Sequence, residues 1–80
     1  MISRRIRFTF EGGAVQEPLV YLLGKQFQIV TNIRMADVEK GFGWVILELD
    51  GEAEEIERGL DWMRSKGVRV DPIAGDVVEG

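Results

Sequence analysis

Two kinds of hydrophobic periodicity alternate along this chain, and their order constrains the fold more than any other feature. Apolar residues recur at every second position in four segments, which is typical of strands with one buried face. In two other segments they recur at every third or fourth position, which is typical of amphipathic helices. The sequence therefore predicts strand, helix, strand, strand, helix and strand, over residues 4–10, 18–27, 28–38, 44–49, 52–66 and 68–71.

This order of elements indicates one particular architecture. Two strand–helix–strand halves with both helices on one face predict a ferredoxin-like α+β sandwich. We therefore expect a βαββαβ fold with a four-stranded antiparallel sheet and two helices on one face. A chain of 80 residues has room for a single core. We expect one domain over residues 1–80, with its core at about 4–73 and a loose tail at 74–80.

The face of the sheet opposite the helices is expected to be open. In the strand 28–38, alternation predicts that Val30, Asn32, Arg34 and Ala36 face the open side. The same alternation places Ile29, Thr31, Ile33 and Met35 on the helix side. On the open side Trp44 and Ile46 would lie among arginines. They are either covered by the tail and by arginine stems, or they form an interface, where Trp and Arg are enriched.

The composition excludes several classes of function. The chain has no cysteine and no histidine, so disulfides, Cys/His metal sites, iron–sulfur ligation and histidine bases are ruled out. We expect no metal, no cofactor and no catalytic residue. A net charge of −4 argues against a nucleic-acid partner. Because there is no long apolar run and no signal-peptide pattern, we expect no membrane insertion and a cytoplasmic location.

One short segment offers an enzymatic alternative. Gly13-Ala14-Val15-Gln16 resembles the phosphate loop of the acylphosphatases, and Asn32 lies on a suitable strand for that family's water-positioning asparagine. The loop departs from the pattern at Glu17 and Pro18, and a glutamate in a phosphate cradle repels its ligand. Tyr21 stands near the position that needs an arginine. An acylphosphatase-like hydrolase therefore stays an alternative to the expectation that the domain is not an enzyme.

A second resemblance covers nearly the whole chain, from about Arg5 to Ile73. The order of Phe8-x-Phe10, a leucine-bearing helix after Pro18, Asn32-Ile33 and a glycine-bounded strand resembles the NIL domain family. That family has a ferredoxin-like, ACT-like fold. One branch is the regulatory domain of the ATPase subunit of methionine importers, and another is fused to a ferredoxin and associated with sulfur assimilation. The chain resembles the second branch more closely, through Ala14-Val15-Gln16-x-Pro18-x-x-Tyr21, Lys25-x-Phe27, Asn32-Ile33-x-x-Ala36-x-Val38 and Asp61-Trp62-Met63-Arg64-Ser65.

The resemblance implies a ligand-binding site at Asn32, with Ile33 beside it. An asparagine amide carries both donors and an acceptor, so it can recognise the ammonium or carboxylate of an amino acid. The family resembled here is named for an Asn-Ile-Leu signature, of which Asn32 and Ile33 are the first two positions; the third position is Arg34 rather than leucine. Arg34 could bind a carboxylate with two hydrogen bonds, or it could pair with Glu48 across the sheet.

Two functions follow from the resemblance. In the first, the domain is a regulatory sensor that binds methionine or a related sulfur amino acid, and it forms a homodimer through a sheet edge or the open face. In the second, it is an interaction adaptor in sulfur assimilation or homocysteine formation without a small ligand. Its protein partner would be a sulfur-transfer enzyme, a ferredoxin or a transporter ATPase.

Overall fold

All six predicted elements are present, in the predicted order. A computed structural model describes residues 1–11, 18–39 and 42–73. The elements within these ranges are β1 (Ile2–Glu11), α1 (Leu19–Gln26), β2 (Ile29–Glu39), β3 (Phe42–Gly51), α2 (Ala53–Ser65) and β4 (Arg69–Pro72). The acylphosphatase-like segment and the tail expected at 74–80 lie outside the described residues.

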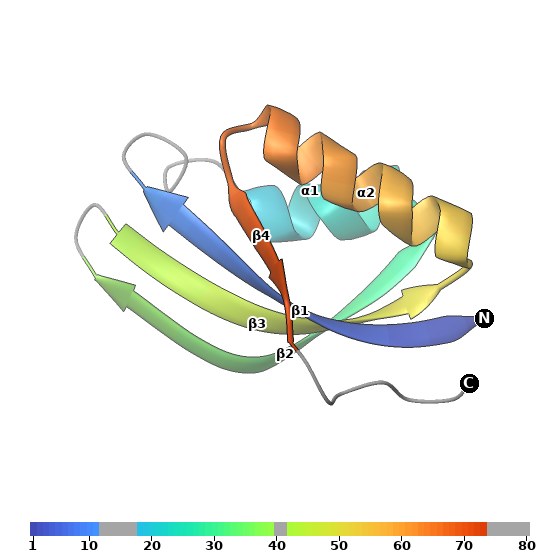
Figure 1. Ribbon diagram of the computed structural model, residues 1–80, viewed down its shortest axis with the longest axis horizontal. Helices are drawn as coiled ribbons and strands as arrows, with labels where there is room; N and C mark the ends of the chain where they lie inside the picture. The colour runs from blue at the N-terminus through green and yellow to red at the C-terminus, as the bar shows by residue number, and fades with distance from the viewer. Residues whose placement is uncertain (12–17, 40–41, 74–80) are drawn as a thin grey trace.

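The four strands form one antiparallel sheet in the order β2-β3-β1-β4. Both helices lie on the same side of this sheet (Figure 1). β1 and β3 are the central strands, and they pair from Ile2 opposite Gly51 to Glu11 opposite Phe42. This topology confirms the predicted ferredoxin-like fold. β2 and β4 form the two edges of the sheet.

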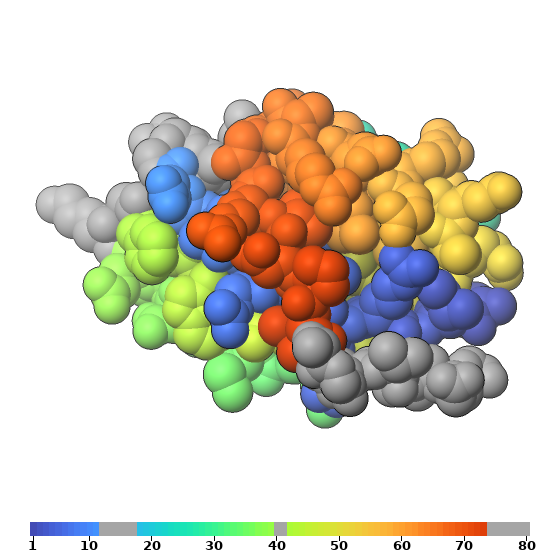
Figure 2. All heavy atoms as spheres, in the orientation of Figure 1, coloured from blue at the N-terminus to red at the C-terminus, as the bar shows by residue number. Residues whose placement is uncertain are grey.

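The core lies between the helices and the sheet. Every second residue of β1 and β3 faces it, because the alternation in these strands is regular. Drawn with all atoms, α2 and β4 form one continuous surface on the side shown in Figure 2. Neither α1 nor α2 is long and apolar enough to cross a membrane. The buried apolar side chains among the described residues are Ile6, Phe8, Leu19, Leu23, Ile29, Val45, Leu47, Leu49, Ile56, Leu60, Met63 and Val68.

The prediction for the second half of β2 is wrong. Ile33 lies opposite Leu47 and Met35 lies opposite Ile46, so Arg34 is an extra residue with no backbone pairing position in β3. Such a β-bulge reverses the faces of all residues that follow it. Met35 therefore faces the open side and is 58% exposed, whereas Ala36 faces the helix side opposite Val45.

Candidate ligand-binding site

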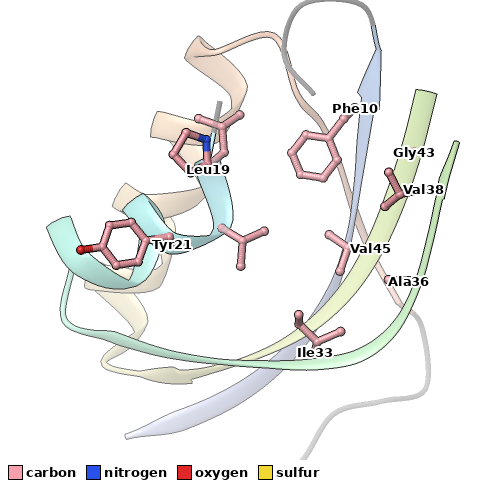
Figure 3. Close-up of a pocket in the computed structure, with 10 residues that line it drawn as sticks. Phe10, Leu19, Tyr21, Ile33, Ala36, Val38, Gly43 and Val45 are labelled. Carbon is pink, nitrogen blue, oxygen red and sulfur yellow. The ribbon is translucent and has the colours of Figure 1, made fainter. Parts of the chain in front are cut away.

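An apolar pocket of about 270 Å³ lies on the helix side of the sheet, between the start of α1 and the second half of β2. Its sheet side chains point towards α1, whereas the Tyr21 hydroxyl points away from them (Figure 3). No charged side chain lines the pocket in the described part of the chain. The lining residues are Phe10, Pro18, Leu19, Val20, Tyr21, Ile33, Ala36, Val38, Gly43 and Val45.

The pocket exists because α1 is too short to cover β2. Eight helical residues span about 12 Å, at about 1.5 Å per residue. The eleven residues of β2 extend about 36 Å, at about 3.3 Å per residue. Packing of α1 therefore buries Ile29 at the start of β2, while every residue from Asn32 to Glu39 is exposed. The uncovered part of the strand forms one wall of the pocket.

Two small residues on neighbouring strands keep the sheet side of the pocket open. Ala36 is opposite Val45, which is buried, and Gly43 is opposite Val38. A Cβ atom at Gly43 would lie 3.2 Å from the Cα atom of Val38, so the two backbones approach closely there. Phe10, the neighbour of Gly43 on β1, forms the next part of the wall.

The structure places the three predicted ligand residues at one edge of the sheet but on both of its faces. Ile33 faces the helix side, lines the pocket and is 60% exposed. Asn32 is opposite Glu48 on the open face, and its amide makes no hydrogen bond within residues 1–11, 18–39 and 42–73. Arg34 lies at the bulge. Asn32 therefore does not line the pocket, although it borders the same strand edge.

Glu48 is the centre of a charged cluster on the open face. Its Oε1 atom lies 3.8 Å from Nη1 of Arg34 and 3.7 Å from Nε of Arg5. The pairing of Arg34 with Glu48 is thus present, at a distance near the limit for an ion pair. The Arg34 side chain is still 45% exposed. It can therefore contact a second carboxylate while it remains beside Glu48.

The sequence predicts only a small part of this pocket. Phe10, Leu19 and Val45 carry only the signal of core residues. The alternation predicts the wrong face for Ala36, because it gives no sign of the bulge. The described residues contain no group of three or more acidic side chains that could hold a metal ion.

A solved protein domain has the same fold. The solved C-terminal domain of an ABC transporter ATP-binding protein from Enterococcus faecalis superposes with a TM-score of 0.78. The superposition covers 91% of this chain and 86% of that one, at 19% sequence identity. This likeness concerns the fold.

Curated relatives have the name methionine import ATP-binding protein MetN. The protein from Lacticaseibacillus paracasei is 28% identical over 75 residues, which cover 89% of this chain and 21% of the relative. The protein from Histophilus somni is 34% identical over 70 residues, which cover 82% and 20%. The chain spans about a fifth of the length of these relatives. The closer likeness to the ferredoxin-fused branch stays a prediction.

The family model of the NIL domain matches residues 4–72. The match runs from β1 to the end of β4 and includes the Asn32-Ile33 pair on β2. It confirms the resemblance of the sequence to this family, and it covers well over half of the chain. The chain therefore belongs to the NIL domain family.

Proposed function

We propose that this domain is a regulatory module that binds a small amino acid, methionine or a sulfur-containing relative. The observation that carries the proposal is the apolar pocket at β2, one wall of which is Ile33 of the family signature pair. Curated relatives are named for methionine import, which agrees with a methionine-type ligand. The domain would act in the cytoplasm, on an ATP-binding transport subunit.

The pocket suits the side chain of such a ligand. A cavity of about 150 Å³ lined by apolar side chains is sufficient for benzene, and this pocket of about 270 Å³ is larger. A thioether side chain has no hydrogen to donate and accepts hydrogen bonds only weakly. It therefore loses no strong hydrogen bond when it leaves water for an apolar pocket. Because no described lining residue is charged, the ammonium and carboxylate groups must stay at the mouth of the pocket.

The charged end of the ligand would lie across the edge of β2. Ile33 borders this edge from the helix side, and Asn32 and Arg34 border it from the open side. Asn32 offers an unused amide to the ammonium or the carboxylate. Arg34, 45% exposed, offers a guanidinium to the carboxylate.

We also propose that the domain without its ligand forms a homodimer through this edge, so that a strand of the second copy and the charged end of the ligand compete for it. On one side β2 pairs with β3, and the described residues place no strand on its other side. Val30, Ile33, Met35 and Val38 are all 58% or more exposed along this strand. A long edge strand with exposed apolar residues readily adds another strand. A second copy of β2 would place its apolar side chains against those of the first copy on both faces of the sheet. It would also close the pocket at the side formed by the edge of β2.

Thermal unfolding in the presence of single amino acids tests ligand binding. A ligand at about 100 times its Kd stabilises the native state by about 2.7 kcal/mol. For a domain of this size, about 4–8 °C of Tm corresponds to 1 kcal/mol, so L-methionine should raise the Tm by roughly 10–20 °C. Asn32→Ala should lose this shift. Gln26→Ala, which removes another exposed amide from the end of α1, should keep it.

A flat result with all amino acids would contradict the proposal and favour the adaptor. One feature of the open face supports that second function. The guanidinium of Arg7 lies over the Trp44 ring, with its Cζ atom 5.7 Å from the ring centroid. Trp44, Ile46 and Arg7 thus form a compact surface of the kind enriched in protein interfaces.

Sedimentation velocity tests the dimer. Met35→Lys adds a charge to the proposed interface outside the pocket, and it should convert the dimer to a monomer. The matched variant Gln26→Lys should leave the dimer intact. A wild-type chain that remains monomeric at high protein concentration would exclude the edge-to-edge homodimer.

A further inference from the structure

The bulge at Arg34 decides which side chains of β2 face the pocket. In a regular strand the residues on the helix side after Ile33 would be Met35 and Asp37. Because Arg34 is an extra residue, the helix side instead carries Ala36, opposite Val45, and Val38, opposite Gly43. The bulge therefore replaces a long side chain and a carboxylate in this wall with an alanine and a valine.

This replacement affects both the size and the polarity of the pocket. A methionine at the position of Ala36 would fill space beside Val45 that is now empty. A carboxylate at the position of Val38 would repel the carboxylate of an amino acid and would lose hydration on ligand binding. With the bulge, Met35 is 58% exposed on the open face and Asp37 lies there opposite Trp44.

Ala36 and Gly43 are the smallest lining residues, but only one of them can vary freely. A Cβ atom at Gly43 would meet the Cα atom of Val38 at 3.2 Å and the carbonyl oxygen of Asp37 at 3.4 Å, so enlargement there would move the backbone. Ala36 already has its Cβ atom on the pocket side. Ala36 lines the pocket on the helix side of β2, opposite Val45, so a larger side chain there occupies pocket space.

We infer that Ala36 is the specificity-determining residue of the pocket, and that its single methyl group sets the bulk of the apolar side chain that the pocket accepts. The inference rests on the proposed function, since it names the residue that selects among ligands of that class. With alanine at this position, the pocket admits an unbranched side chain such as a thioether. Each carbon added at Ala36 excludes one carbon or more of the ligand.

Two probes separate this inference from the proposed function. L-methionine tests the complete ligand, and ethyl methyl sulfide tests the side-chain part without its charged groups. Binding is followed by NMR through the methyl signals of Val45 and Leu19, which line the pocket. The variants are Ala36→Val and Ala36→Leu. Asp37→Leu is the control, because it adds the same side chain at the next residue, on the opposite face.

We expect both probes to shift the Val45 and Leu19 signals of the wild-type protein. One methylene in an apolar pocket changes affinity by about tenfold or more, so Ala36→Val, which adds two carbons, should raise the Kd of both probes by about a hundredfold. Ala36→Leu should abolish the shifts, and Asp37→Leu should change the Kd by less than about twofold. Urea unfolding of each variant shows that it is folded. Ala36→Val is the decisive variant if Ala36→Leu does not fold.

The other outcomes are distinguishable. If Ala36→Val binds both probes as the wild type does, Ala36 does not set the pocket size and the inference is overturned, while the proposed function stands. If the wild type binds the sulfide but not methionine, the proposed function fails and the role of Ala36 is still measured with the sulfide. Methionine that shifts only signals of the open face, or a wild type that binds neither probe, overturns the inference.

Discussion

The substitution Gly51→Ala should destabilise the protein strongly, although it adds a single methyl group. Gly51 is buried at the end of β3, where it pairs with Ile2 of β1 and Ile29 of β2. A Cβ atom at this position would lie 2.9 Å from the carbonyl oxygen of Gln28. That oxygen belongs to the backbone just before β2, so it cannot rotate away. The start of β2 would have to move away from β3.

The magnitude follows from the rigidity of this contact. Overpacking that forces a backbone shift costs about 1–3 kcal/mol, and we expect about 2 kcal/mol here. For an 80-residue domain this corresponds to a decrease in Tm of about 8–16 °C. The free energy of unfolding is measured by equilibrium urea denaturation, with the fluorescence of Trp44 and Trp62 as the signal.

Gly59→Ala is the matched control, because its contacts are closer but softer. A Cβ atom at Gly59, in the middle of α2, would lie 2.7 Å from Cδ1 of Ile29 and 2.9 Å from Cδ1 of Leu23. Both atoms are ends of side chains that can change rotamer. Replacing a glycine by alanine within a helix also gains about 1 kcal/mol. We therefore expect a net cost below about 1 kcal/mol. If Gly59→Ala proves the more costly variant, the argument from backbone rigidity is refuted.

Three further predictions concern the stability of the domain. Met63→Ala should cost about 2–5 kcal/mol in urea denaturation, because the Met63 side chain is fully buried in the core. Gly67→Ala should cost about 1 kcal/mol in the same assay, because Gly67 has φ of +86° but no atom within 4 Å of an added Cβ. Arg4→Ala should cost less than about 1 kcal/mol, and 1 M salt should remove most of this difference, because the Arg4–Glu57 ion pair is substantially exposed.

The fold could be predicted from the sequence because its central strands alternate without interruption. In β1, Ile6 and Phe8 face the core as expected, and in β3 so do Leu47 and Leu49. These strands have neighbours on both sides and helices on one face, so a shift of one residue would expose a complete apolar row. Packing therefore forces the same alternate residues to face the core as the hydrophobic pattern predicts.

The faces of β2 could not be predicted, and the reason is its place at the edge. Beyond Ile33 neither face is covered by a helix, and every residue up to Glu39 is exposed. The bulge at Arg34 reverses the faces of the residues that follow it, which exposes Met35 but uncovers no core residue. Apolar residues also occur on both faces of this strand: Val30 lies on one face and Ile33 on the other. Alternation alone cannot reveal a bulge in such a strand.

The signature pair itself indicates where a ligand can lie. Asn32 and Ile33 are consecutive residues of one strand, so their side chains point to opposite faces of the sheet. No ligand of amino-acid size can contact both from one face, since the sheet backbone separates them. It can contact both only along the free edge of β2, with one end over the pocket and the other on the open side. If both members of the pair bind the ligand, the free edge of β2 is the site, and a second copy of β2 paired along this edge would displace the ligand.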